Sequence, residues 1–167
     1  MDIKNSKNPT VALTVANQKG GVGKTVLASN AAIYAEKAYR VVVIDLDPQM
    51  NASKVFARRG YKENYTFDLF QKELDFSEIG LNDNNAIFKA SPELLNLQDL
   101  DLDLFAKNIQ NLKQHHENLF IVFDTPPVAG ALQIISLVCR NYIISPIEMK
   151  EFSIDGVSQI INTFQNV

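Results

Sequence analysis

A glycine-rich segment between residues 17 and 25 has the composition of a loop that binds phosphate. It reads Asn-Gln-Lys-Gly-Gly-Val-Gly-Lys-Thr, follows a short apolar run and precedes a helical pattern. Glycines allow the backbone to curl so that successive N–H groups point into one cavity, where phosphate oxygens can bind. The helix that begins near Gly23 adds its positive dipole end to the same cavity. The segment therefore predicts a binding site for the phosphates of a nucleotide.

Three side chains give the predicted site its chemistry. Lys24 is placed to reach the β- and γ-phosphates, and the hydroxyl of Thr25 is suited to bind Mg²⁺. A further lysine, Lys19, stands at the start of the loop, and Gln18 replaces the first glycine of the general G-x-x-x-x-G-K-[ST] pattern. The alternative for Lys19 is a solvated lysine, and the alternative for the whole segment is a glycine turn without a nucleotide. The predicted phosphate site comprises Lys19, Gly20, Gly21, Val22, Gly23, Lys24, Thr25 and Val26.

Two carboxylates follow the second predicted strand, where the apolar run of residues 40–46 ends. Asp45 and Asp47 stand two residues apart, so in an extended chain both side chains project to the same side. One of them can then orient an attacking water molecule, while the other holds the water shell of Mg²⁺ or fixes Lys24. The alternative is that one of the pair caps the turn before Pro48.

A third carboxylate, Asp124, ends the apolar run of residues 119–123. Mg²⁺ usually keeps several of its waters in protein sites, so we expect Asp124 to bind the ion through water. Pro126 and Pro127 then fix the turn. The alternative is an aspartate that caps the next helix.

Apolar runs that alternate with helical patterns provide the frame for these residues. Continuous apolar strands are typical of a parallel sheet buried on both faces, and ligands bind beyond the carboxyl ends of such strands. The predicted strands are residues 10–16, 40–46, 86–90, 119–123 and 142–145. The predicted helices are residues 24–37, 104–115, 131–138 and 154–164. Two short helices are also predicted, one that ends at residue 59 and is capped by Asn51 or Ser53 and one near residues 67–74, and a turn is predicted at residues 82–85. The predicted fold class is α/β, with a mostly parallel sheet and helices on both faces.

The composition excludes several classes of protein. The chain has 167 residues, of which 46% are apolar and 21% charged, so it is neither a disordered nor a fibrous sequence. No apolar run approaches the roughly 20 residues that cross a bilayer, and residues 1–8 lack the apolar core of a signal peptide.

The single cysteine, Cys139, permits no internal disulfide and is predicted to be a packed core thiol. We assign no role to His115 and His116, which fall in a predicted loop. These features predict a soluble intracellular protein of one domain.

The net charge of −3 conceals an uneven distribution. Residues 1–62 carry ten basic and four acidic side chains, whereas residues 63–103 carry two basic and ten acidic ones. Such polarity can steer a charged partner, and the alternative is two solvated faces. The chain has one compact basic cluster, formed by Arg58, Arg59 and Lys62. Two interpretations of this cluster are a contact with DNA phosphates and an ordinary solvated surface.

Several of these motifs together resemble one known family. The sequence KGGVGKT resembles the deviant Walker A motif of the ParA/MinD superfamily of switch ATPases, and DLDPQ, FDTPP and IISPIEMKEFSIDGVSQI resemble the corresponding ParA stretches. The DPQ sequence favours the ParA branch, the Soj-like partition ATPases, over MinD. The iron-protein branch is disfavoured because its cluster needs two cysteines per subunit. The resemblance covers nearly the whole chain and implies a P-loop NTPase fold.

The resemblance also implies a role for each candidate residue. Lys19 reaches across a dimer interface to the phosphates bound by the other subunit, and Lys24 acts on the phosphates of its own. Asp47 positions the hydrolytic water, with Asp45 as the supporting carboxylate, and Asp124 is the Walker B acid. The implied magnesium ligands are Thr25, Asp45 and Asp124. The two aspartates are expected to bind the ion through water.

The implied function is a switch ATPase that dimerises with ATP and Mg²⁺ and hydrolyses ATP to ADP and phosphate. In partition ATPases this cycle drives the segregation of plasmids or chromosomes. The implied partners are a second copy of the chain, a centromere-binding ParB-like protein and nonspecific DNA, without a membrane. The acidic residues 63–103 are a candidate docking face for a basic segment of the partner protein. The implied location is the bacterial cytoplasm, with association with the nucleoid as a further expectation.

Two departures from the family pattern bear on these expectations. Val26 stands where the family usually has Thr or Ser, and relatives extend well beyond the position of Val167. We expect residues 1–167 to form a single P-loop domain, as a fragment or a reduced member, without the C-terminal strands and the adenine-binding segment of longer relatives. Two alternatives stay open: a nucleotide-binding interaction module without productive hydrolysis, and a MinD-like division regulator. The regulator needs a basic amphipathic C-terminal helix, and residues 155–167 contain no Lys or Arg.

Overall fold

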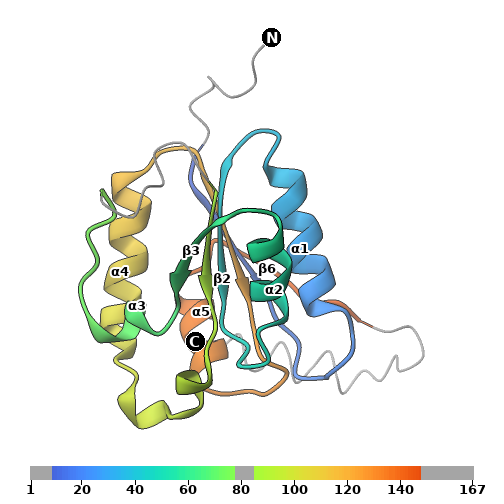
Figure 1. The fold of residues 1–167 in the computed structure, drawn as a ribbon. Helices are drawn as coiled ribbons and strands as arrows, with labels where there is room; N and C mark the ends of the chain where they lie inside the picture. Colours follow the sequence, from blue (N-terminus) through green and yellow to red (C-terminus); the bar gives the residue numbers. More distant parts are fainter. Residues whose placement is uncertain (1–8, 78–84, 148–167) are drawn as a thin grey trace.

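A sheet of six parallel strands organises the chain in the computed structural model, which describes residues 9–77 and 85–147 (Figure 1). The strands are β1 Val11–Val15, β2 Arg40–Asp45, β3 Lys62–Tyr65, β4 Ala86–Lys89, β5 Leu119–Asp124 and β6 Tyr142–Ile144. They lie in the order β3-β4-β2-β5-β1-β6, and every adjacent pair is parallel. The predicted α/β class with a parallel sheet is confirmed.

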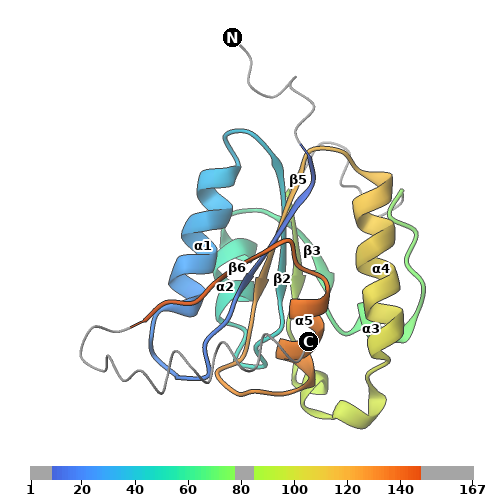
Figure 2. The same cartoon turned by 180° about the vertical axis from the view of Figure 1, so that it is seen from behind.

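Helices cover both faces of this sheet (Figures 1 and 2). On one face lie α1 Lys24–Ala35 and α2 Asn51–Arg58, and on the other lie α3 Asp68–Gln71, α4 Leu102–His115 and α5 Ala131–Val138. The side chains of β2 divide between the two layers: Val41 and Val43 pack with α1 and α2, whereas Val42 and Ile44 pack with the other helices. Because both faces are buried, the central strands are apolar throughout, and this is the pattern that the sequence displays.

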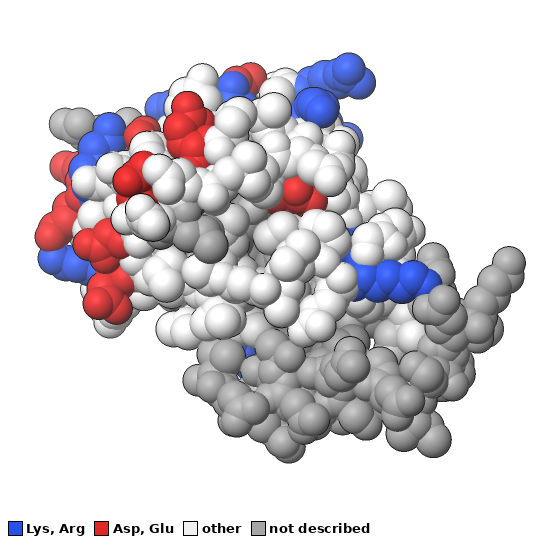
Figure 3. Space-filling view, turned by 90° about the horizontal axis from the view of Figure 1, so that it is seen from below, with Lys and Arg blue, Asp and Glu red and all other residues white. Residues whose placement is uncertain are grey.

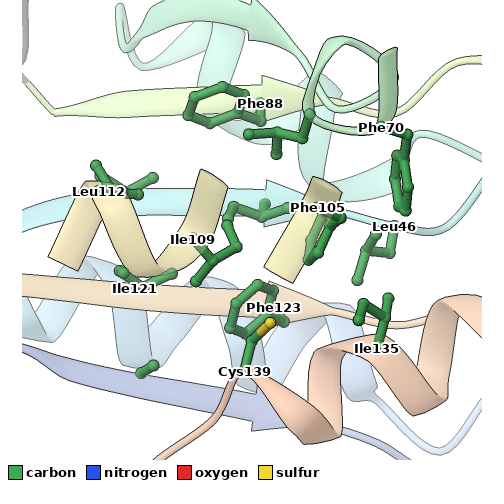
Figure 4. Close-up of a cluster of buried hydrophobic side chains, with 14 of the residues drawn as sticks. Leu46, Phe70, Phe88, Phe105, Ile109, Leu112, Ile121, Phe123, Ile135 and Cys139 are labelled. Carbon is green, nitrogen blue, oxygen red and sulfur yellow. The ribbon is translucent and has the colours of Figure 1, made fainter. Parts of the chain in front are cut away.

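Aromatic side chains fill the layer between the sheet, α3 and α4 (Figure 4). The rings of Phe70 and Phe105 stack with their centroids 4.5 Å apart, and Phe123 of β5 lies 6.4 Å from Phe105. Cys139 belongs to the same cluster and is 7% exposed, and burial raises the pKa of its thiol to about 11. The prediction of a core thiol is confirmed.

The register of the central strands brings their carboxyl ends to one edge. Asp45 of β2 and Val15 of β1 are both paired with Asp124 of β5. Just beyond these ends, the Leu46 N–H donates to the Asp124 carbonyl oxygen at 2.9 Å, and Thr125 Oγ1 donates to the Val15 carbonyl oxygen at 2.8 Å. The segments that follow these three strands therefore leave the sheet side by side, at its lower edge in Figure 1.

The edge strand β3 is the one strand of the described residues that the sequence pattern does not reveal. It reads Lys-Glu-Asn-Tyr, and three of its four side chains are exposed. Its backbone pairs with β4 from Lys62 opposite Ala86 to Tyr65 opposite Lys89. An edge strand with polar side chains carries neither an apolar run nor an alternating pattern, so nothing in its composition distinguishes it from a loop.

Helix α4 begins at Leu102 because Asp101 caps it: Asp101 Oδ1 accepts the Leu104 N–H at 2.9 Å. The helix predicted over residues 104–115 is confirmed at its end, because His115 is the last residue of α4; the separate placement of both histidines in a loop was wrong for His115. His116 follows the helix and is buried.

The predicted turn at residues 82–85, apart from Asn85, and the predicted helix at residues 154–164 lie outside the described residues. No helix in the part of the chain that the structure describes is long and apolar enough to cross a membrane.

Candidate nucleotide-binding site

The glycine-rich loop leaves the end of β1 and enters α1 through left-handed backbone conformations. Gly21 has φ of 77° and Gly23 has φ of 87°, a region that favours glycine. Gly23 is the residue that precedes α1, and no side chain caps this helix. The first N–H groups of α1 are therefore open to a ligand, and this arrangement suits an anion.

Asn17 fixes the start of the loop. Its Oδ1 accepts the Lys19 N–H at 2.8 Å, and its Nδ2 donates to the Pro146 carbonyl oxygen at 2.8 Å and to Ser145 Oγ at 3.3 Å. The loop is thus tied to the segment that follows β6. The sequence interpretation missed Asn17, although an Asn two residues before a loop N–H is a known turn signal.

Lys24, at the start of α1, turns its amine back into the loop. The residue is 7% exposed, and Nζ donates to the Lys19 carbonyl oxygen at 3.0 Å. Burial lowers the pKa of Lys24, while the nearby charges of Asp124 and Asp47 act in the opposite direction. The structure therefore brings these three predicted site residues together at the carboxyl edge.

Asp124 is fully buried, and neither of its carboxylate oxygens has a hydrogen-bond partner. Burial raises the pKa of Asp124 to about 7; the side chain of Thr25 and the charge of Lys24 act in the opposite direction. A buried carboxylate without a partner is costly, and a bound cation with its waters would remove that cost. The predicted alternative, a helix cap, does not describe this residue, because its oxygens accept no N–H.

Magnesium fits the side chains that are present. Among the described residues no three His, Cys, Asp or Glu side chains gather as a metal-binding group. Mg²⁺ is usually bound by one or two carboxylates together with waters and the phosphates of a substrate. The unpartnered oxygens of Asp124 and the neighbouring hydroxyl of Thr25 are such a partial set, which a nucleotide would complete.

Asp45 has a different environment, since three donors occupy its oxygens. Oδ2 accepts the Ser53 N–H at 2.8 Å and Ser53 Oγ–H at 2.7 Å, and Oδ1 accepts the Asp47 N–H at 3.0 Å. Burial raises the pKa of Asp45 to about 6, while these hydrogen bonds lower it. Asp45 thus holds the start of α2 and the turn after β2, which is the capping alternative. Its role at the magnesium ion stays a prediction.

Asp47 stands at the beginning of that turn and is 7% exposed. Its Oδ1 accepts the Gln49 N–H at 3.0 Å, and its carbonyl oxygen accepts the Met50 N–H at 2.8 Å. Met50 has φ of 59°, so the chain reverses sharply before α2. Both carboxylates of the pair therefore support a turn, and Asp47 in addition lies near Lys24.

Two side chains of the predicted phosphate site, apart from the exposed glycines, lie on the surface. Lys19 is exposed, and Val26 is 65% exposed on the outer side of α1. Contact of the Lys19 and Val26 side chains with the phosphates of a nucleotide bound to the same chain stays a prediction.

The comparisons with known proteins agree with this geometry. Residues 10–167 match the family model described as an AAA domain. The chain is 34% identical over 178 residues to Protein IncC of Escherichia coli, and 27% identical over 166 residues to the sporulation initiation inhibitor protein Soj of Bacillus subtilis. It is also 36% identical over 175 residues to the uncharacterized protein MJECL24 of Methanocaldococcus jannaschii. The chain belongs to this AAA domain family and to the ParA/MinD superfamily.

This ParA/MinD-superfamily chain corresponds to part of each curated relative. The matched regions cover 94% of the chain for MJECL24 and 93% for IncC and Soj, but 66%, 46% and 65% of those proteins. The chain thus spans about half to two thirds of the length of the curated relatives that it matches.

Solved structures share the fold at lower identity. A plasmid partition protein from Borrelia burgdorferi matches with a TM-score of 0.76 and 22% identity, over 95% of this chain and 74% of that one. Cobyrinic acid a,c-diamide synthase from Mycobacterium smegmatis, with bound ATP analogue and magnesium, matches with a TM-score of 0.75 and 23% identity, over 95% of this chain and 68% of that one. The ParA/MinD chain therefore has an α/β P-loop NTPase fold.

Proposed function

We propose that this ParA/MinD-superfamily chain binds ATP with Mg²⁺ at residues 19–25 and hydrolyses it to ADP and phosphate as a dimerising switch. One observation carries the proposal: Asp124 is a buried carboxylate whose oxygens have no hydrogen-bond partner, at the same edge as Lys24 and the glycine loop. The names of the relatives, two of which are Soj proteins and others IncC, support a role in plasmid or chromosome partition.

Each group of the site has a task in phosphoryl transfer. The glycine N–H groups, the start of α1 and the Lys24 ammonium bind the phosphates. Thr25 and Asp124, the latter through water, hold the magnesium ion, with Asp45 as a further carboxylate at the same edge. The ion supplies neutralisation of the negative charge on the phosphates. Catalysis of this kind is positioning and charge stabilisation, so the chain needs no covalent intermediate.

Asp47 orients the attacking water. Its position is set by the turn after β2, because the Asp47 N–H donates to Asp45 and its carbonyl oxygen accepts the Met50 N–H. Asp45 acts on the reaction through this turn and through its bonds to Ser53. We expect Asp47→Asn to keep nucleotide binding and to lose hydrolysis.

Lys19 acts on the partner subunit. Its side chain is exposed at the mouth of the loop, while its carbonyl oxygen accepts Lys24 Nζ. A lysine supplied by a second copy makes nucleotide binding and dimerisation one coupled event. The other proposed partners are a ParB-like protein and nonspecific DNA, in the bacterial cytoplasm.

The test is light scattering of the chain with Mg²⁺ and a slowly hydrolysed ATP analogue. We expect dimers for the unmodified chain and for Lys37→Ala, a control at an exposed lysine beyond the end of α1, and monomers for Lys19→Ala. Dimers that persist in Lys19→Ala would contradict the role of this lysine. Bound nucleotide with monomers throughout would favour an interaction module without hydrolysis, and no bound nucleotide would contradict the proposal for this chain.

A further inference from the structure

Asn17 is a buried polar side chain between the end of β1 and the glycine loop, and it has no role in the reaction proposed above. It is 9% exposed, and both polar atoms of its side chain have partners. Oδ1 accepts the N–H of Lys19, and Nδ2 donates to two oxygens of the segment that follows β6. Because both ends of the amide are occupied, the side chain has one defined orientation. Asn17 thus links the loop to a segment that is distant in sequence.

The segment at the far end of this link is itself held in place, beside β1 at the edge of the sheet (Figure 2). Ala16 donates its N–H to the Ile144 carbonyl oxygen at 3.1 Å. Ser145 precedes Pro146, and a residue before proline is largely confined to extended conformations, while the proline ring fixes its own φ. The Pro146 carbonyl oxygen, 2.8 Å from Asn17 Nδ2, therefore belongs to a stiff part of the chain and is a firm anchor.

The backbone of Lys19 is held at both of its polar groups. Its N–H donates to Asn17 Oδ1 at 2.8 Å, and its carbonyl oxygen accepts Lys24 Nζ at 3.0 Å. In the proposed function the Lys24 ammonium turns to the phosphates, whereas the bond to Asn17 uses no group that the nucleotide needs. Asn17 therefore still holds the Lys19 backbone when a nucleotide draws Lys24 away.

The exposed acidic side chains are unevenly distributed over the edge of the sheet where the loop lies. Most of those visible at this carboxyl edge lie on the side of α3 and α4, away from α1 (Figure 3). They attract an ammonium near the start of α1 only weakly, because salt screens exposed charges over about 10 Å. The held backbone therefore decides the direction in which the exposed Lys19 side chain leaves the loop.

We propose that Asn17 is a positioning residue for Lys19. It holds the Lys19 backbone against the segment after β6 and so directs the lysine side chain toward the phosphates bound by a second copy of the chain. This inference rests on the proposed function, in which Lys19 acts on the partner subunit. A backbone that is fixed beforehand loses no further conformational entropy when the dimer forms. The contacts of a chain with its own nucleotide do not pass through Asn17, so this residue separates nucleotide binding from dimerisation.

The first test compares nucleotide binding with dimerisation in Asn17→Ala. Fluorescence anisotropy of a labelled, slowly hydrolysed ATP analogue in dilute protein measures the affinity of the monomer, and light scattering over a range of protein concentrations measures the dimer dissociation constant. We expect the affinity to stay within about three-fold and the dimer dissociation constant to rise at least about ten-fold. Fixing the backbone of one residue is worth about ten-fold, and a symmetric dimer contains two such lysines.

The matched control is Asn141→Ala, because Asn141 ties the same two strands together at their other ends. Its Oδ1 accepts the Ala12 N–H at 2.9 Å. We expect this variant to leave the nucleotide affinity and the dimer dissociation constant within about two-fold, since the contact is remote from the loop. Urea unfolding followed by circular dichroism measures the stability that each variant loses and shows that both are folded.

The second test needs no nucleotide. Trypsin cleaves after lysine, and the bond between Lys19 and Gly20 reaches the protease only when the loop opens locally. We expect cleavage at this bond, identified by mass spectrometry, to be about ten-fold faster in Asn17→Ala and within about two-fold of the unmodified chain in Asn141→Ala.

Asn17→Asp separates the two ends of the link. A carboxylate still accepts the Lys19 N–H, but it cannot donate and would face the Pro146 carbonyl oxygen. Because the proposal needs the anchor as well as the loop contact, we expect Asn17→Asp to resemble Asn17→Ala in both tests. Behaviour like that of the unmodified chain would overturn the part assigned to the segment after β6.

Three results would overturn the positioning role of Asn17. They are an unchanged dimer in Asn17→Ala, equal losses of nucleotide affinity and of dimerisation, and effects of the same size in Asn141→Ala. A chain that binds no nucleotide, but whose loop is cleaved faster in the Asn17 variants alone, gives a different answer. It contradicts the proposed function and with it the direction toward a second copy, while the link between Asn17 and the loop stands.

Discussion

Replacement of Ser53 by alanine is expected to destabilise the fold by about 2–4 kcal/mol, because this hydroxyl has two buried partners. Oγ donates to Asp45 Oδ2 at 2.7 Å and accepts the Ala90 N–H at 3.0 Å. A hydrogen bond to a charged group contributes about 1.5–3 kcal/mol, and a buried N–H left without an acceptor costs about 1–3 kcal/mol. The two contributions are not additive, because Asp45 keeps the backbone N–H groups of Ser53 and Asp47.

Urea unfolding followed by circular dichroism measures this loss as a lower midpoint with an unchanged slope. The chain offers a matched control in Ser77, whose Oγ donates to Asp75 Oδ1 at 2.6 Å in an exposed pair. Ser77→Ala is expected to cost less than about 0.5 kcal/mol, since water replaces the lost donor. Equal losses in both variants, or a loss below about 1 kcal/mol in Ser53→Ala, would refute the reasoning that burial sets the value of this hydrogen bond.

Two further predictions concern the loop and the buried carboxylates. Burial raises the pKa of Asp45 to about 6 and that of Asp124 to about 7, from 3.8, so between these values the folded chain binds more protons than the unfolded chain. The free energy of unfolding without Mg²⁺ should therefore fall as the pH rises from about 4 to 7, and Asp124→Asn should flatten this profile in urea titrations. Gly23→Ala should lose about 1–2 kcal/mol in the same assay, because φ is +87° although nothing lies within 4 Å of the added Cβ. Gly130→Ala, with an equally open site and an extended φ of −175°, should stay near zero.

The parts of the fold that are buried on both faces could be predicted from the sequence. The runs that became β1, β2 and β5 are continuous and apolar, because side chains on both sides of each strand are packed under helices. Strand β3 could not be predicted, since its position depends on pairing with β4 and its side chains face solvent. The helix predicted over residues 104–115 ends at His115, as α4 does. The burial of His116 was not predicted, because a polar residue after a helix suggests a solvated loop.

The residue types of the candidate site were also predictable, but their bonding partners were not. The order of strand, glycine loop and helix indicates where Lys24 lies, and the ends of β2 and β5 indicate the aspartates. Nothing in the spacing shows that Ser53, eight positions further on, occupies one oxygen of Asp45. Nor does it show that Asn17 reaches Pro146, a residue 129 positions away. Such contacts depend on how distant segments meet at the sheet edge, which local pattern does not encode.

The two ionisable groups at the centre of the site explain why nucleotide binding and folding should be coupled in this chain. Burial lowers the pKa of Lys24 and raises that of Asp124, so each group is driven toward its neutral form. Their mutual attraction opposes this effect but leaves both oxygens of Asp124 without a hydrogen-bond partner. Phosphate oxygens stabilise the charged form of Lys24, and a hydrated Mg²⁺ ion stabilises the charged form of Asp124. The ligand therefore relieves two costs that the free chain carries, and any state that binds it is stabilised relative to the unfolded chain.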